Sequence, residues 1–186
     1  MSNAAIAKKT RWYRKLHRWI ASVLFAFFLL ISTTGLLLAW KKNSGGYLLA
    51  KTHEGRSKEL SGWLPLDSLQ KNAIRAIHTR ISPDLPAEVD RMDIRPDKGM
   101  LKVTFRDHYW AVQLDGATGN VLHLERRRAD FIEHLHDGSL LDRLSGWNGL
   151  KLTYSSIMGI ALLLLTISGF WLWYNPKRIR KKKPLA

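Results

Sequence analysis

The sequence has no cysteine, and its acidic residues are confined to the middle of the chain. Without Cys, the 186 residues can form no disulfide, thiolate metal site, thioether-linked haem or cysteine nucleophile. All fifteen Asp and Glu lie between Glu54 and Asp142, whereas the thirty Lys and Arg extend to both ends and give a net charge of +15. The chain is therefore a middle region of mixed charge with purely basic ends.

Charge is also missing from two long apolar segments, Trp19 to Trp40 and Leu152 to Tyr174. A helix of that length measures about 33 Å, enough to cross a hydrocarbon core of about 30 Å. Core helices of soluble proteins seldom run so far without a charge, and a cleavable signal has a shorter apolar core. We predict two transmembrane helices, the first an uncleaved signal anchor.

The flanking cations predict the orientation of these helices. Six cations precede the first segment and six follow the second, whereas only two stand at each inner flank. Because Lys and Arg are retained on the cytoplasmic side, both termini are expected in the cytoplasm of a bacterial inner membrane and residues 42–150 in the periplasm. The outer cations are Lys8, Lys9, Arg11, Arg14, Lys15, Arg18, Lys177, Arg178, Arg180, Lys181, Lys182 and Lys183.

Several functions are disfavoured by what the chain lacks. The basic ends adjoin membrane spans, so they indicate topology and contact with the lipid bilayer, and no nucleic-acid partner is predicted. Neither span contains an ionisable side chain from Asp, Glu, Lys, Arg or His, which disfavours a proton or ion path. The sequence has no H-E-x-x-H zinc motif, G-x-S-x-G elbow or glycine-rich phosphate loop. No catalytic residue is predicted.

The middle region has the pattern of a small α+β domain. Apolar residues at helical spacing predict a helix over 66–80, after a loop over 43–62 that could include a short strand. Alternating residues separated by turn sequences predict four strands. A helix packed on an antiparallel meander would bury one face of each. The strands are expected at 89–95, 100–106, 108–114 and 120–125.

A basic run, Arg126 to Arg128, leads into an amphipathic stretch that is interrupted at Gly138. We predict a connector lying on the outer membrane surface. The three arginines are either a solvated charge run or contacts for lipid phosphates or an anionic ligand such as a ferric siderophore. The predicted order is a basic cytoplasmic tail (1–18), transmembrane helix 1 (19–40), the periplasmic domain (41–128), the interfacial connector (129–151), transmembrane helix 2 (152–174) and a basic cytoplasmic tail (175–186).

The two spans share a small polar stretch, Ser32-Thr33-Thr34-Gly35-Leu36 in the first and Thr166-Ile167-Ser168-Gly169-Phe170 in the second. In an antiparallel hairpin these stretches lie near opposite membrane faces. Small residues let helices approach closely, and hydroxyls bond across to a neighbour or back to their own helix. Helix packing is favoured here over a substrate route.

Together these motifs resemble the PepSY-associated transmembrane family. The similarity lies in Leu16-His17-Arg18-Trp19 with Thr34-Gly35-Leu36, in the run from Leu114 to Leu122 within the meander, and in Leu135-His136-Asp137-Gly138 with Ser168-Gly169-Phe170-Trp171. It covers most of the chain in the family's order. The resemblance implies an α+β membrane protein, a two-helix hairpin carrying a PepSY-like domain. Longer members have further hairpins, and some are ferric-siderophore reductases that bind b-type haem.

The resemblance implies that His17 and His136 are candidate ligands of haem b iron, with His134 as a further candidate partner. A bis-histidine haem needs two neutral imidazoles on opposite sides of one iron, in an apolar slot. His17 and His136 are expected near opposite membrane faces, so each would need a ligand from another copy, from a membrane-protein partner or, on the outer side, from His134. His134 and His136 are two residues apart and point in different directions on a helix.

Two functions remain open on these sequence features. The first is an accessory electron-transfer subunit with haem b, linked to periplasmic iron or siderophore reduction. The second is a non-catalytic, membrane-anchored PepSY module that binds or regulates a partner protein or protease.

Overall fold

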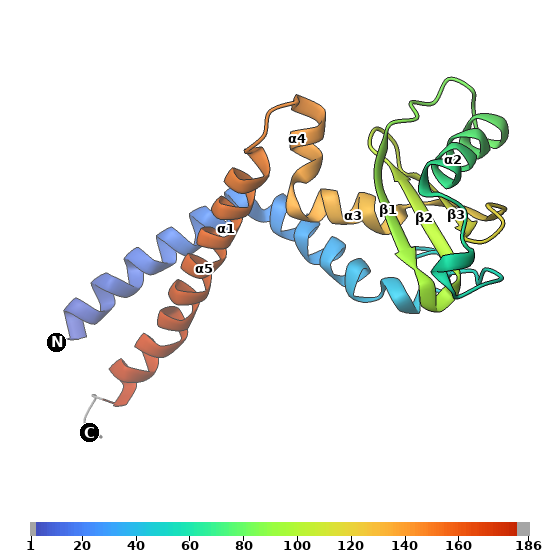
Figure 1. The fold of residues 1–186 in the computed structure, drawn as a ribbon. Coiled ribbons are helices and arrows are strands. Elements are labelled where there is room, and N and C mark those ends of the chain that lie inside the picture. Colours follow the sequence, from blue (N-terminus) through green and yellow to red (C-terminus); the bar gives the residue numbers. More distant parts are fainter. Residues whose placement is uncertain (1–2, 182–186) are drawn as a thin grey trace. The chain divides into compact units, whose positions relative to one another are not determined.

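The computed structural model describes residues 3–181 and separates into two units, which we treat individually (Figure 1). The hairpin unit comprises the described parts of residues 1–36 and 134–186. The sheet unit comprises residues 37–133. Helix α1 and helix α3 each have residues in both units, since their bounds are Asn3–Ala39 and Arg128–Asp137.

The hairpin unit is built on α1 and α5 (Leu150–Lys181), both long and apolar enough to span a membrane. Only 11% and 17% of their most apolar windows are buried, whereas a core helix of a soluble protein would be mostly covered. Both helices therefore have the length, composition and exposure expected of membrane spans. Helix α1 begins at Asn3, so the basic residues before Trp19 lie on the same helix as the apolar segment.

The sheet unit holds four antiparallel strands in the order β1-β2-β3-β4. The strands are β1 (Val89–Arg95), β2 (Met100–Phe105), β3 (Trp110–Asp115) and β4 (Val121–Arg126), and they follow helix α2 (Leu66–Arg80). Gly99, at φ +64°, closes the turn between β1 and β2. At the turn between β3 and β4, the carboxylate of Asp115 accepts a bond from the Ala117 N–H at 2.9 Å.

The core of the sheet unit lies between α2 and one face of the sheet. Residues three or four apart on α2 meet alternate residues of β2 and β3, as the two periodicities require. This confirms the predicted helix on an antiparallel meander. The buried residues are Leu69, Ala73, Ala76, Ile77, Leu101, Val103, Phe105, Val112 and Leu114.

The segment before α2 differs from the prediction of a possible short strand. Residues 43–62 contain no strand, and two short 3₁₀ helices, Lys41–Asn43 and Leu60–Gly62, flank an irregular stretch. Side chains of β3 satisfy its backbone: the Gln113 side-chain carbonyl accepts from the His53 N–H at 2.9 Å, and its amide donates to the Lys51 carbonyl at 2.9 Å. A buried side chain thus replaces the strand partner that the segment would otherwise need.

Two helices connect the sheet to α5. Helix α3 ends at Asp137 and α4 (Ser139–Ser145) starts directly afterwards. Gly138 between them has φ +80°, which favours glycine, and a Cβ there would lie 2.5 Å from Cδ1 of Tyr154. The predicted interruption at Gly138 is confirmed.

Candidate cofactor site

His17 lies on α1 and contacts the polar stretch of α5. Its Nδ1 is 2.9 Å from Oγ of Ser168, a side chain that is almost completely buried. The Ser168 hydroxyl donates its proton to the Leu165 carbonyl at 3.1 Å, so it accepts from His17. In a neutral imidazole, this hydrogen-bond network places the proton of His17 on Nδ1 and the lone pair on Nε2.

His136, in the last turn of α3, repeats this arrangement on α1. Its Nδ1 is 2.9 Å from Oγ1 of Thr34. Thr34 donates to the Leu30 carbonyl at 2.7 Å and also approaches the Ile31 carbonyl at 3.1 Å. By the same count of donors and acceptors, a neutral His136 ring has its proton on Nδ1 and its lone pair on Nε2.

A glycine follows each hydroxyl and gives the ring space. A Cβ on Gly35 would lie 3.3 Å from Cε1 of His136, and a Cβ on Gly169 would lie 3.6 Å from Cε1 of His17. The first of these distances is tight enough to shift a neighbour. The polar stretch of each span therefore provides a hydroxyl and a flat backbone surface for one histidine of another helix, α3 for the first span and α1 for the second.

The Nδ1 hydrogen bonds of the two imidazoles are of the kind that metal-ligating histidines form. Histidines that ligate a metal usually hold their other ring nitrogen in a hydrogen bond, which fixes the tautomer and the ring plane. His17 and His136 both do so through Nδ1. The residues present therefore fit one imidazole ligand for a haem at each end of the hairpin.

The two histidines cannot bind the same iron within one chain. His136 contacts Thr34, and Thr34 lies about 25 Å along α1 from His17 at 1.5 Å per residue. His134 lies on α3, where two positions correspond to a rotation of about 200° away from His136. Among residues 3–181, no three His, Asp or Glu side chains are grouped to hold a metal ion.

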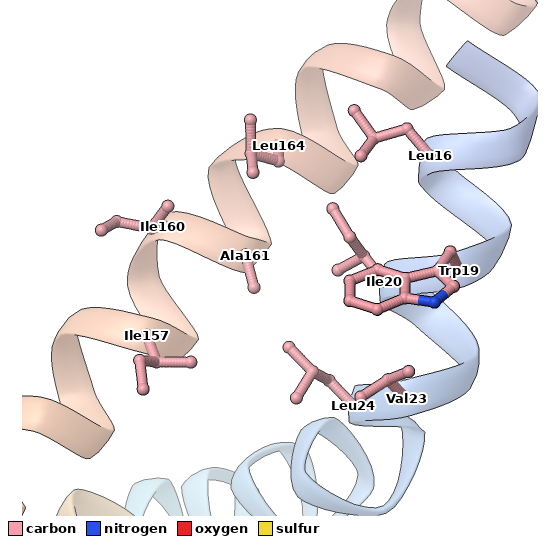
Figure 2. Close-up of a pocket in the computed structure, with 9 residues that line it drawn as sticks. All are labelled: Leu16, Trp19, Ile20, Val23, Leu24, Ile157, Ile160, Ala161 and Leu164. Carbon is pink, nitrogen blue, oxygen red and sulfur yellow. The ribbon is translucent and has the colours of Figure 1, made fainter. Parts of the chain in front are cut away.

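An apolar groove runs beside His17 between α1 and α5 (Figure 2). Its volume is about 420 Å³. Ile20 and Leu24 follow His17 by three and seven positions and share its side of α1, while Leu164 precedes Ser168 by four. Figure 2 shows Leu16, Ile20 and Leu24 pointing from α1 toward α5. The lining residues are Leu16, Trp19, Ile20, Val23, Leu24, Ile157, Ile160, Ala161 and Leu164.

Polar contacts to α5 hold the corner that carries His136. Asp137 forms an ion pair with Lys151 at 2.5 Å, and its carboxylate accepts from the Ser139 N–H at 2.9 Å. Ser155 donates to the Asp137 carbonyl at 3.1 Å. Burial alone would raise the pKa of Asp137, but the hydrogen bonds from Lys151 and Ser139 outweigh it and lower the pKa to about 2.

This ion pair predicts a stability loss in acid. The folded pKa of Asp137, about 2, lies below its ordinary value of 3.8, so its contribution is present above pH 3.8 and is lost as the pH falls toward 2. We expect Asp137→Asn to lower the Tm of the detergent-solubilised protein at pH 7. The difference in Tm between the variant and wild type should disappear as the pH falls from about 4 to about 2. Asp84→Asn is the control, and a gap that is constant with pH would contradict the assignment.

The family comparison covers the hairpin and the sheet unit together. The family model described as PepSY-associated TM region matches residues 14–185. This chain belongs to the PepSY-associated TM family. The match includes both candidate spans, both histidines and the meander, so the resemblance noted from the sequence is confirmed. Neither the curated proteins nor the solved structures gave a match.

Within this PepSY-associated TM protein, the structure brings His17 and His136 to hydroxyl partners that the sequence pattern did not assign to them. From the sequence, Thr34 and Ser168 are predicted only to be small polar residues that contribute to helix packing. The available signal is the repeat itself. Each span has a hydroxyl followed by glycine near its C-terminal end, and one histidine precedes each span. His134 lies on α3, two positions before His136.

Proposed function

We propose that this PepSY-associated TM protein is an accessory redox subunit of the bacterial inner membrane, with both termini cytoplasmic and residues 42–150 periplasmic. His17 and His136 would each ligate a b-type haem, and the subunit would be linked to periplasmic reduction of iron or ferric siderophores. The observation that carries the proposal is the shared geometry of the two histidines, in which Nδ1 is hydrogen-bonded to a hydroxyl and Nε2 is the ring nitrogen left to ligate a metal.

A b-type haem, when bound, supplies one-electron redox chemistry. The chain's own residues would position it: Ser168 and Thr34 orient the two rings, and the apolar groove beside His17 excludes water. Each end of the hairpin offers a single ligand. The second ligand at each end is expected from another copy or a membrane-protein partner, because His17 and His136 lie at opposite ends of the hairpin.

Absorption spectroscopy tests this function directly. The full chain, expressed in a bacterium with haem precursors supplied and purified in mild detergent, is expected to show a Soret band and, after dithionite reduction, an α band. We expect about one haem per chain, because a dimer in which the two copies share one haem at each end of the hairpin binds two haems for two chains. A colourless protein that is folded and oligomeric would reject haem binding.

A non-catalytic PepSY module that binds or regulates a partner protein or protease is the second candidate. The incomplete ligand set of each end favours it, since a lone imidazole does not by itself make a bis-histidine site. A folded, haem-free protein that co-purifies with a defined membrane partner would support this candidate.

The hydroxyl partners give a prediction specific to the proposed geometry. Thr34→Val and Ser168→Ala remove the acceptor for a histidine Nδ1–H while keeping the side chain small. Loss of such a contact typically costs 10–100-fold in metal affinity, so we expect haem to dissociate about that much more readily from the affected end. Haem transfer to apomyoglobin measures this loss.

Thr166→Val is the matched control. Thr166 lies in the same stretch of α5, but its hydroxyl donates to the Leu162 carbonyl at 2.8 Å and has an exposed position. Its haem affinity should stay at the wild-type value. If Thr166→Val and Ser168→Ala lose haem equally, the hydroxyl contacts do not position the ligands.

A further inference from the structure

The sheet unit has a second concave feature, separate from the histidine pairs. This cavity has a volume of about 780 Å³, the size of a site for a small organic ligand. Its lining comes from the last turn of α1, the loop after it, the loop after α2, the turn between β2 and β3, the start of β3, the end of β4 and the first residues of α3. Most of its lining is apolar, and a basic run forms part of the wall. We name it the arginine cavity.

The three arginines of this run have different environments. Arg127 is buried and pairs with Asp130, with Nε at 2.7 Å and Nη2 at 2.6 Å from the same carboxylate oxygen. Its Nη1 donates to the Phe105 carbonyl at 3.2 Å. Arg127 is therefore a structural residue whose charge is already compensated within the sheet unit.

Arg126 and Arg128 are exposed and stack on aromatic rings of the same cavity. The guanidinium of Arg126 lies 5.5 Å from the Trp110 ring, and that of Arg128 lies 4.4 Å from the Tyr47 ring. Arg128 also donates from Nη1 to the Tyr47 carbonyl at 3.1 Å. Within residues 3–181, no carboxylate forms an ion pair with either. Stacking orients a guanidinium while leaving most of its donors available to an anion.

The remaining polar groups of the cavity leave its rim cationic. Asp107 is the carboxylate among the lining residues, against the two unpaired guanidiniums. Burial is the main cause that lowers the pKa of His108, and its Nε2 is bonded to the Pro86 carbonyl at 3.1 Å, so this imidazole is neutral at pH 7. An anion is the complementary ligand.

The apolar wall of the arginine cavity belongs partly to the membrane helix. Leu37 lies in the last turn of α1, which is long and apolar enough to cross a bilayer. Phe131 and Tyr47 contribute rings that are 43% and 66% exposed, far from the burial expected of core aromatics. An apolar surface with a cationic rim at the end of a membrane helix matches a ligand that has both an acyl chain and an anionic headgroup.

We propose that the arginine cavity binds an anionic glycerophospholipid. The phosphate lies between the guanidiniums of Arg126 and Arg128, which can each donate to phosphate oxygens. The acyl chain runs along Leu37, Phe131 and Ile132. A free phosphate would leave this apolar wall in water, and a neutral lipid would leave the two guanidiniums without a net anionic partner. The site is independent of haem.

Direct binding to the full chain in neutral detergent micelles tests the proposal. Native mass spectrometry would measure retention of dioctanoyl phosphatidylglycerol, dioctanoyl phosphatidylcholine and glycerol 3-phosphate, each at the same concentration. We expect the phosphatidylglycerol to bind at least about tenfold more tightly than the other two, which lack the net negative charge and the chains respectively. Equal retention of either one would overturn the proposal.

Variants localise the site. Arg126→Gln with Arg128→Gln should weaken phosphatidylglycerol binding at least about tenfold, because both charge-assisted phosphate contacts are lost. Both side chains are exposed, so the fold should be retained. Phe131→Ser should weaken phosphatidylglycerol without changing glycerol 3-phosphate. The control, Arg80→Gln, removes an exposed arginine of α2 and should bind as wild type. Unchanged binding in the double arginine variant, or equal loss in the control, would refute the site.

Discussion

His17→Ala is expected to remove about half of the haem, and His136→Ala the other half, while the double variant is colourless. The reason is geometric. Each histidine occupies a different end of the hairpin and has its own hydroxyl partner, so each would complete a different site with a second copy or partner. An alanine has no nitrogen to offer iron, which makes the loss at the affected end complete. The haem content per chain, measured as the pyridine haemochrome, reports it.

The matched control is His123→Ala. His123 lies on β4 and stacks on His53 at 4.8 Å between ring centroids, within the sheet unit and outside both pairs. Its haem content should equal that of wild type. The reduced spectra of the two single variants should also differ, because each retains a different site. Full haem content in the double variant would show that neither histidine is a ligand.

The regular parts of the fold could be predicted because their signals are local. Helix α2 runs from Leu66 to Arg80 as its spacing indicates, and β1 has the predicted bounds. The other three strands differ from the predicted bounds by one or two residues at their ends. Alternation of apolar residues sets which face of a strand is buried, and turn residues mark where it ends. The charge-free spans are equally local signals.

Residues 51–56 were not predictable because their partners are distant in sequence. The backbone of this segment bonds to side chains of Gln113 and Asp115, about sixty positions later. A propensity pattern contains no information on such pairings. Strand Gln and Asp are usually interpreted as solvent-facing, whereas here they are buried and hold a segment that crosses the second face of the sheet.

The candidate site was predicted in part for a similar reason. Family resemblance identified His17 and His136, but an intramembrane hydroxyl has the same pattern whether it bonds back to its own helix or across to a neighbour. Thr34 and Ser168 do both. The basic run, Arg126 to Arg128, is a second example. The sequence shows three equivalent arginines, and only the fold shows that Arg127 is buried and paired with Asp130 whereas its two neighbours are exposed.

The second large effect is expected from Phe105→Ala, which should destabilise the sheet unit by about 3–5 kcal/mol. Phe105 ends β2 and is completely buried among the core residues contributed by α2, β2 and β3. Its truncation removes aromatic contacts and leaves a cavity that this small core can fill only partially. Its carbonyl is also the acceptor for buried Arg127, so displacement of the strand end would strain that bond.

Hydrogen exchange followed by mass spectrometry on the full chain in detergent measures this effect for the sheet alone. Amides of β2 and β3 should exchange about two to three and a half powers of ten faster, since each 1.4 kcal/mol is tenfold. The matched control is Phe131→Ala, because Phe131 is the same residue type but 43% exposed, with Tyr109 as its ring neighbour at 5.4 Å. Phe131→Ala should lower the free energy of unfolding of the sheet unit by at most about 1 kcal/mol. Comparable exchange in the two variants would show that the α2-facing layer does not determine the stability of this unit.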